Sequence, residues 1–333
     1  METDAVIFES PGKVVAGRAT VPDQLGPQEL LIRTHYTFVS PGTERWILLD
    51  KFRAKDGPLP PPFPRVPGYQ RVGEVLDVGS EVKDVKPGQI VFSALARTEK
   101  PVWMWGSHIS VGVSPAEFVL PLPEGMSEEE VAALVIVQVG YNAGTRPPVK
   151  LGDVAVVVGD GLIGQFAAQT LRARGAYVIQ SGLMDERLEM ARGLSADETV
   201  NPQRTDLVKH LRKLQSRGAD IVVESVGLRG NIPQCIEMLS QNGHYVSLGY
   251  YPQENPFDLM KVHGLETTIY NPSSFTRERL QGALRALQLG KLHVRELITH
   301  RLPWRKAPEA FRMVVDGKPH SLGIVLDWRE GKA

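Results

Sequence analysis

The clearest chemistry-bearing feature of the sequence is a set of three glycines, Gly159-Asp160-Gly161-Leu162-Ile163-Gly164. It follows an apolar run and precedes a helix-like segment, which is the context that makes this spacing informative. The first glycine permits a tight turn, the second lets backbone N–H groups approach a pyrophosphate, and the third lets helix and strand pack closely. The helix N-terminus adds partial positive charge. We therefore predict that Gly159, Gly161, Leu162, Ile163 and Gly164 bind a dinucleotide cofactor; the alternative is a glycine-rich structural turn.

The charge at the end of the next predicted strand bears on which nicotinamide cofactor fits. An acidic residue there accepts hydrogen bonds from the ribose hydroxyls of NAD, but this sequence has Ser181 followed by Gly182. The missing carboxylate leaves the space open and uncharged, and either Arg187 or Arg204 could pair with a 2′-phosphate. The alternative is that both arginines are solvated surface residues. We predict that Ser181, Gly182, Arg187 and Arg204 belong to the cofactor site and that NADP(H) is favoured over NAD(H).

The elements that would position this site alternate between strand and helix from residue 153 onward. Apolar runs predict strands at 154–158, 177–180, 220–224 and 245–249, and helical patterns lie at 164–174, 185–192, 206–215 and 232–239. Such alternation indicates an α/β fold with a doubly wound parallel sheet. Val226, Gly249 and Tyr250, at or after the later strands, complete the predicted cofactor-binding set.

The N-terminal part has a different pattern. Short apolar runs at 5–8, 29–32, 71–76 and 89–92 are separated by turn residues, which predicts a small, mostly antiparallel β-domain. Six prolines between 58 and 67 predict a stiff surface loop that is neither helix nor central strand. A helix is expected to open at 127–130, where a serine precedes three glutamates. The tail predicts helices at 277–289 and 307–315 and a strand at 323–327.

The composition excludes several classes of protein. The 333 residues carry 38 basic and 38 acidic side chains, and a chain with no net charge has no general attraction for nucleic acid. The single cysteine, Cys235, excludes an intrachain disulfide and a cysteine cluster for metal. The N-terminus lacks the features of a signal peptide, and no apolar run approaches the roughly 20 residues of a membrane span. We expect a cytoplasmic protein of two domains.

Three further stretches carry a resemblance to a known family: Ser40-Pro41-Gly42-Thr43-Glu44, Val66-Pro67-Gly68-Tyr69-Gln70-Arg71-Val72-Gly73-Glu74-Val75 and Val85-Lys86-Pro87-Gly88-Gln89-Ile90-Val91. With the glycine motif, they resemble the medium-chain dehydrogenase/reductase superfamily over nearly the whole chain. The resemblance implies a GroES-like β-rich catalytic domain formed by residues 1–120 and 272–333, and a Rossmann dinucleotide-binding domain formed by residues 121–271. It also implies a small-molecule substrate and a homodimer.

The sequence departs from this family where many members bind zinc. Pro41 stands where zinc-binding members carry a ligating cysteine, Tyr69 and Gln70 replace a His-Glu pair, and Val135 occupies the remaining position. None of these four side chains is a usual zinc ligand. The four-cysteine lobe that holds a structural zinc in many relatives is also absent, its place being taken by residues 101–108. We therefore predict that the protein binds no zinc.

Without zinc, the substrate oxygen must be stabilised by hydrogen-bond donors, or the substrate must be an enone or quinone that spreads the charge. Tyr69, at the position of the lost histidine, and Thr43, where relatives place a hydroxyl near the substrate oxygen, are the predicted catalytic residues. The alternatives stay open. Tyr69 could be an aromatic that fills the vacated metal pocket, and Thr43 could be a turn-capping hydroxyl.

A substrate pocket is predicted around Trp46, Gln70 and His108, with Trp103 and Trp105 as further apolar lining. His108 is also a candidate for proton transfer. The tryptophans could instead anchor their loops, and His108 could be purely structural. The sequence thus predicts hydride transfer between NADP(H) and a carbonyl, enone or quinone-like molecule. One alternative is an alcohol or polyol dehydrogenase related to the bacteriochlorophyllide dehydrogenases, which the stretches at 40–44 and 67–70 resemble. The other is a nucleotide-binding protein without catalysis.

Overall fold

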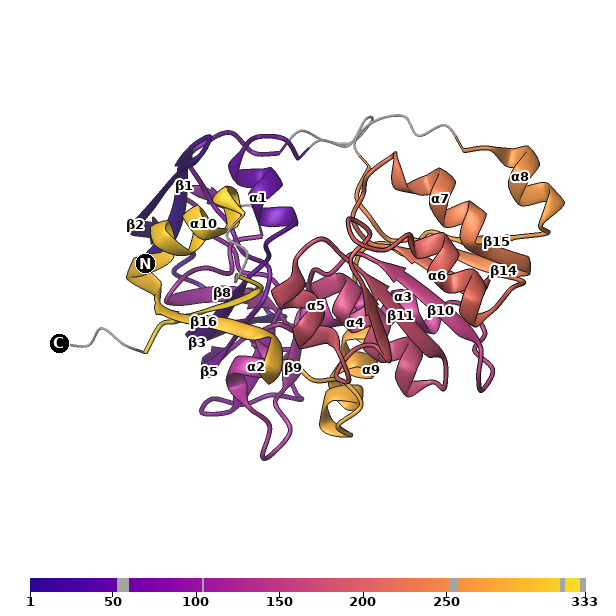
Figure 1. The fold of residues 1–333 in the computed structure, drawn as a ribbon. Helices are drawn as coiled ribbons and strands as arrows, with labels where there is room; N and C mark the ends of the chain where they lie inside the picture. Colours follow the sequence, from indigo (N-terminus) through magenta and orange to yellow (C-terminus); the bar gives the residue numbers. More distant parts are fainter. Residues whose placement is uncertain (53–59, 104, 252–256, 318–320, 330–333) are drawn as a thin grey trace. The chain divides into compact units, whose positions relative to one another are not determined.

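A computed structural model describes residues 1–52, 60–103, 105–251, 257–317 and 321–329 (Figure 1). The chain divides into two compact units. The first unit consists of Met1–Val135, Thr276–Leu284 and Ile298–Ala333, and the second of Ile136–Phe275 and Arg285–Leu297. The predicted α/β class is confirmed, since one part carries a doubly wound parallel sheet and the other is rich in β-strands. Compact units are not themselves domain boundaries, so the predicted bounds at 120 and 272 remain predictions.

Two sheets build the first unit. A four-stranded sheet has the order β2-β1-β4-β7, and a seven-stranded sheet has the order β16-β17-β3-β5-β6-β9 with β8 paired to β3. Their bounds are β1 Glu2–Ser10, β2 Lys13–Thr20, β3 Glu29–Val39, β4 Arg65–Val66, β5 Arg71–Val78, β6 Ile90–Ser93, β7 Val102–Trp103, β8 Val111–Pro115, β9 Val119–Pro121, β16 Ile298–Pro303 and β17 Gly323–Asp327. The C-terminal strand β17 pairs antiparallel with β3, so the tail completes the N-terminal sheet.

The prediction for the proline-rich segment was wrong at its end. Arg65 and Val66 form β4, which lies inside the four-stranded sheet between β1 and β7. Both residues are buried, and the Arg65 guanidinium donates to the carbonyl oxygens of Pro61 and Ile47. A short strand is possible because neither residue is proline, so both keep their backbone N–H groups. The beginning of the segment, Pro58 and Leu59, lies outside the described residues.

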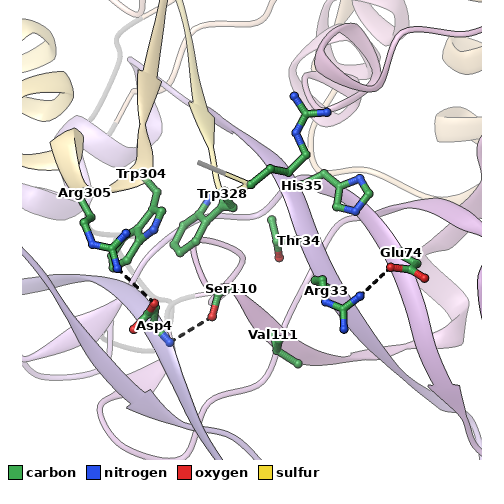
Figure 2. Close-up of a pocket in the computed structure, with 11 residues that line it drawn as sticks. Asp4, Arg33, Thr34, His35, Glu74, Ser110, Val111, Trp304, Arg305 and Trp328 are labelled. Atoms are coloured by element: carbon green, nitrogen blue, oxygen red, sulfur yellow. Dashed lines mark hydrogen bonds and ion pairs between the residues drawn. The ribbon is translucent and has the colours of Figure 1, made fainter. Parts of the chain in front are cut away.

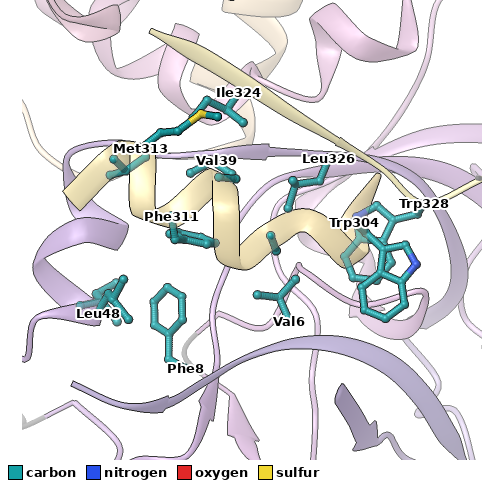
Figure 3. Packing of buried hydrophobic residues seen from close by; sticks show 14 residues of the cluster. Val6, Phe8, Val39, Leu48, Trp304, Phe311, Met313, Ile324, Leu326 and Trp328 are labelled. Carbon is teal, nitrogen blue, oxygen red and sulfur yellow. The ribbon is translucent and has the colours of Figure 1, made fainter. Parts of the chain in front are cut away.

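Helix α10 (Ala307–Asp316) covers the apolar core of the first unit (Figure 3). The ring of Phe311 meets that of Phe8 edge to face at 4.9 Å, and Trp304 stacks on Trp328 at 4.8 Å. Helices α1 (Thr43–Leu48) and α2 (Glu128–Val131) complete the first unit, α3 (Leu134–Thr145) begins in it, and α9 (Arg277–Gln288) spans both units. The predicted helix openings at 127–130 and 277 and the strand at 323–327 are confirmed.

Six parallel strands form the sheet of the second unit in the order β12-β11-β10-β13-β14-β15. Their bounds are β10 Val154–Val158, β11 Tyr177–Ser181, β12 Glu198–Val200, β13 Ala219–Glu224, β14 Leu239–Ser247 and β15 Thr268–Tyr270. The accompanying helices are α4 Leu162–Ala173, α5 Asp185–Ala191, α6 Leu207–Leu214, α7 Asn231–Met238 and α8 Leu259–Gly264. β10 is apolar throughout because both its faces are covered. Ala155 and Val157 pack with residues of α4, and Val154 and Val156 with residues of α6 and α7.

Candidate active site

The glycine motif forms the turn between β10 and α4 in the second unit. Gly159 has φ +122°, a conformation that side-chain-bearing residues rarely adopt, and its N–H donates to the Ser181 carbonyl at 2.8 Å. A Cβ on Gly164 would overlap the Gly159 carbonyl oxygen and lie 2.9 Å from Ser225 Oγ. Gly161 caps α4 in an extended conformation with nothing within 4 Å of its Cβ position. The first and third glycines are therefore required by packing, and the second leaves open space above the helix N-terminus.

This difference predicts opposite outcomes for two alanine substitutions. Gly164→Ala should destabilise the folded protein by about 1–3 kcal/mol, because the added methyl meets backbone. Gly161→Ala should leave thermal stability unchanged, because its φ of −74° suits alanine, yet should weaken NAD(P)H binding by about tenfold or more. Differential scanning fluorimetry and coenzyme titration measure the two effects. Unchanged affinity in Gly161→Ala would contradict the placement of the pyrophosphate at this turn.

Two further loops lie at the same edge of the sheet, after β13 and β14. Val226 and Tyr250 are exposed there although both are hydrophobic. The loops touch through glycines, since a Cβ on Gly227 would lie 2.6 Å from the Tyr250 carbonyl oxygen, and one on Gly249 would overlap the Gly227 backbone. The structure thus brings Val226, Gly249 and Tyr250 to the carboxyl edge that carries the glycine turn, where ligands of such sheets bind.

Glu224, the last residue of β13, organises these loops and was not singled out from the sequence. Its buried carboxylate accepts hydrogen bonds from the backbone N–H groups of Val226 and Gly227, at 3.0 Å each, from Asn231 Nδ2 at 3.1 Å and from the Tyr251 hydroxyl. Burial and this carboxylate together raise the pKa of Tyr251 above its ordinary value. A polar residue that ends an otherwise apolar buried strand is the signal that could have found Glu224.

The space at Gly182 is neither open nor uncharged, contrary to the prediction. A Cβ on Gly182 would lie 2.6 Å from Cγ of Asp160, whose carboxylate occupies that position. The Met184 N–H donates to Asp160 Oδ2 at 2.9 Å, and Arg187 Nη1 lies 3.5 Å from Oδ1. The prediction failed because it considered only carboxylates carried by the second strand, whereas this one comes from the turn after the first. Ser181 is buried beside this turn.

Arg204 pairs with a different carboxylate. Its guanidinium pairs with Asp185, the first residue of α5, and both side chains are exposed. Exposed pairs of this kind contribute about 0–1 kcal/mol. Of the two predicted phosphate partners, Arg187 is therefore the one held next to the end of β11.

The predicted catalytic residues come together in the first unit. Tyr69 is half-buried, its hydroxyl donates to Ser40 Oγ, and Thr43 lies within interaction distance of the same phenol. Burial raises the pKa of Tyr69 above its ordinary value of 10.0, and the nearby Glu44 carboxylate raises it further. The phenol therefore remains protonated at neutral pH and can act as a hydrogen-bond donor. Trp105 meets the Tyr69 ring edge to face at 5.3 Å, which fixes the ring plane.

Two buried side chains, His108 and Glu44, lie next to each other and contact the Tyr69 group through Ser40. His108 and Glu44 are both completely buried, and His108 Nε2 lies 3.0 Å from Glu44 Oε1. The other Glu44 oxygen accepts the Ser40 N–H at 2.6 Å, and His108 Nδ1 lies 2.7 Å from Thr37 Oγ1. Ser40 therefore contacts both the phenol of Tyr69 and the carboxylate of Glu44. Ser40 and Glu44 stood in the family-like stretch of sequence, but neither was assigned a role there.

Gln70, Pro41 and Val135 are the other positions at which the family resemblance implies zinc ligands. The side-chain amide of Gln70 is completely buried, donating to the Phe38 carbonyl at 3.2 Å and accepting the Val135 N–H at 3.1 Å. Pro41 and Val135 have no side-chain donor atoms. Within the described parts of the chain, no group of three or more His, Cys, Asp or Glu side chains is placed to hold a metal ion.

The residues predicted to line the substrate pocket differ in exposure. Trp46, on α1, is partly exposed, whereas Gln70 and His108 are closed off from solvent. Trp105 is partly buried and packs between Tyr69 and Phe52. The Trp103 side chain lies outside what the structure describes. No helix in the described residues combines the length and apolar character that a membrane crossing requires.

A different hollow, of about 420 Å³, lies elsewhere in the first unit (Figure 2). Its wall includes the stacked pair Trp304 and Trp328, together with Arg33, His35 and Arg305. The charged groups already have partners, since Arg33 pairs with Glu74 at 2.7 Å and Arg305 lies 3.9 Å from Asp4. This hollow contains none of the residues in the Tyr69 group or the glycine turn, and we assign it no role.

Comparisons with known proteins match parts of both units. A family model described as a zinc-binding dehydrogenase matches residues 163–288, and one described as an alcohol dehydrogenase GroES-like domain matches residues 26–124. An alcohol dehydrogenase of Cupriavidus necator is 25% identical, covering 89% of this chain and 91% of its own. An Escherichia coli oxidoreductase of unknown specificity, involved in membrane biogenesis, superposes with a TM-score of 0.87 at 23% identity, covering 98% and 99% of the two chains. A Sinorhizobium meliloti protein described as a zinc-binding dehydrogenase, solved with NADP, gives 0.85 at 20% identity over the same shares.

The chain belongs to the medium-chain dehydrogenase/reductase superfamily, the family of zinc-type alcohol dehydrogenases. It is an NAD(P)-dependent oxidoreductase.

Proposed function

We propose that this protein transfers a hydride between a nicotinamide dinucleotide and a carbonyl, enone or quinone-like small molecule without a zinc ion. The observation that carries the proposal is the Tyr69 phenol, which stands at the position of a zinc-ligating histidine and is held by Ser40. In the zinc-dependent mechanism the metal polarises the substrate oxygen. A preorganised O–H donor can stabilise the same developing charge.

The residues at the zinc positions do not fit the metal. Zinc sites in this kind of enzyme use three protein ligands drawn from Cys, His and carboxylates. Here Pro41 and Val135 offer no donor atom, and both ends of the Gln70 amide are occupied by backbone groups. Tyr69 keeps its proton because burial raises its pKa, and a neutral phenol is a poor ligand for zinc. The proposed reaction therefore uses no metal ion.

The bound nicotinamide dinucleotide supplies or accepts the hydride. Tyr69 holds a proton at its phenolic oxygen, and in the structure this O–H donates to Ser40 Oγ. With substrate bound, the O–H turns to the substrate oxygen, on which negative charge develops during reduction, and the Ser40 hydroxyl donates to the phenolic oxygen in its place. Thr43 supplies a second hydroxyl beside the first. Gln70 and His108, which are buried, act as supports of the site rather than as lining, while Trp46 remains a candidate for the wall of the substrate pocket.

The proposal does not specify which nicotinamide dinucleotide binds, nor the oligomeric state. The predicted preference for NADP(H) depended on an uncharged space at Gly182, and that space holds the Asp160 carboxylate. The proposal therefore includes both dinucleotides at this point. The homodimer implied by the resemblance and the similarity to bacteriochlorophyllide dehydrogenases remain predictions.

Metal content tests the zinc-free proposal. Inductively coupled plasma mass spectrometry of the purified protein should find less than about 0.1 zinc ion per chain, because no ligand set fits the ion. Prolonged dialysis against a chelator should leave the rate of coenzyme oxidation with an enone or quinone panel unchanged. A known zinc-dependent alcohol dehydrogenase, treated in parallel, serves as the control. Stoichiometric zinc that is lost together with activity would overturn the proposal.

A further inference from the structure

The second unit places a carboxylate where the sequence had indicated none. β10 and β11 are parallel neighbours, with Val158 opposite Ser181. The residues that follow these two strands, Asp160 and Gly182, therefore lie side by side at the carboxyl edge of the sheet. Because Gly182 has no side chain, the Asp160 carboxylate fits into the space in which a side chain of residue 182 would begin.

This carboxylate is fixed in place. Asp160 is only 9% exposed, and the backbone N–H of Met184 donates to its Oδ2 at 2.9 Å. Arg187 Nη1 lies 3.5 Å from Oδ1, longer than a good hydrogen bond, so the guanidinium offsets the charge without forming a close contact. The backbone of both neighbouring strand ends thus defines where the negative charge sits.

We propose that Asp160 takes the part of the missing acidic residue at the end of β11 and makes this protein prefer NADH to NADPH. This inference depends on the proposed function only in requiring that a nicotinamide dinucleotide binds at the glycine turn. A carboxylate at this edge accepts hydrogen bonds from the two ribose hydroxyls of NADH. The 2′-phosphate of NADPH would instead bring a second anion beside it, in a partly buried place where charges are weakly screened.

The structure also changes which substitution can test coenzyme choice. Gly182→Asp would add a carboxylate where one already stands, and its Cβ would lie 2.6 Å from Asp160 Cγ. That variant is expected to bind both coenzymes worse. Asp160→Asn is the informative change, because asparagine has nearly the same shape and its carbonyl oxygen can still accept the Met184 N–H, while the charge is lost.

The experiment measures dissociation constants of NADH and NADPH by titration calorimetry, so that no substrate is needed. The unmodified protein should bind NADH at least about tenfold more tightly than NADPH, and Asp160→Asn should reduce this ratio by about tenfold or more. Asp185→Asn is the matched control, since it also neutralises a carboxylate with an arginine partner near this edge, but an exposed one. It should change the ratio by less than about twofold.

The outcomes separate the two proposals. If the unmodified protein binds NADPH as tightly as NADH, or if Asp160→Asn leaves the ratio unchanged, the role of Asp160 is overturned while hydride transfer stands. If it binds neither coenzyme, the proposed function fails and the inference fails with it. If Asp160→Asn does not fold, Asp160→Ser serves the same test, because it also removes the charge and its hydroxyl can accept a hydrogen bond from a backbone N–H. The expected change in the ratio of NADH to NADPH affinity is the same.

Discussion

Tyr69→Phe is expected to lower kcat for carbonyl reduction by about 10²–10³-fold while leaving coenzyme affinity unchanged. The substitution removes a single oxygen, the one that donates to Ser40 and that we place against the substrate oxygen. The ring keeps its edge-to-face contact with Trp105, so the fold of the site should persist. Steady-state rates with a saturating enone or quinone substrate, together with coenzyme titration, measure the two quantities.

Tyr177→Phe is the control for loss of a phenol. Tyr177 begins β11, at the strand end opposite the glycine turn, and its hydroxyl bonds Glu198. The Tyr177→Phe variant should reduce the substrate at the same rate as the unmodified protein. The dependence of the rate on pH gives a second check, because burial raises the pKa of Tyr69 above its ordinary value of 10.0. Ionisation of this phenol should therefore cause no loss of reduction below about pH 10. A Tyr69→Phe variant with normal kcat would mean that the phenol only fills space.

The elements of the second unit could be predicted from the sequence because their patterns are local. Val154–Val158 is apolar throughout and ends at a glycine turn, and the structure has β10 and the turn in those places. The short edge strands β12 and β15 escaped prediction. Each has only three residues, too few to show a strand period, and their existence depends on pairing with β11 and β14. Pairing of this kind is a tertiary effect that no short window of sequence records.

The charges around the candidate site were harder to predict from the sequence, for a related reason. Gly182 correctly indicated that residue 182 carries no carboxylate, yet it did not indicate which other side chain would enter the vacated space. Asp160 is 22 positions earlier, and only the parallel register of β10 with β11 brings the two together. Likewise, the sequence analysis placed Gln70 and His108 in the substrate pocket. In the structure both side chains are completely buried, and burial depends on how the whole core packs.

The buried pair beneath Tyr69 is expected to be important for stability. His108→Leu should lower the free energy of unfolding of the first unit by about 1–3 kcal/mol, because it removes the polar neighbour of two buried groups, Glu44 Oε1 and Thr37 Oγ1. All five tryptophans, Trp46, Trp103, Trp105, Trp304 and Trp328, belong to the first unit, so their fluorescence during urea unfolding reports on that unit alone.

His35→Leu is the matched control. It removes a histidine that pairs with Glu128 at 2.7 Å in the same unit, but at a partly exposed place, so it should cost about 1 kcal/mol or less. The double variant His108→Leu with Glu44→Gln should cost at least about 1 kcal/mol less than the sum of the two single variants, since each single change already removes the same contact. If His108→Leu proved no more costly than His35→Leu, or if the two single effects simply added, Glu44 and His108 would not act as a coupled support for the phenol.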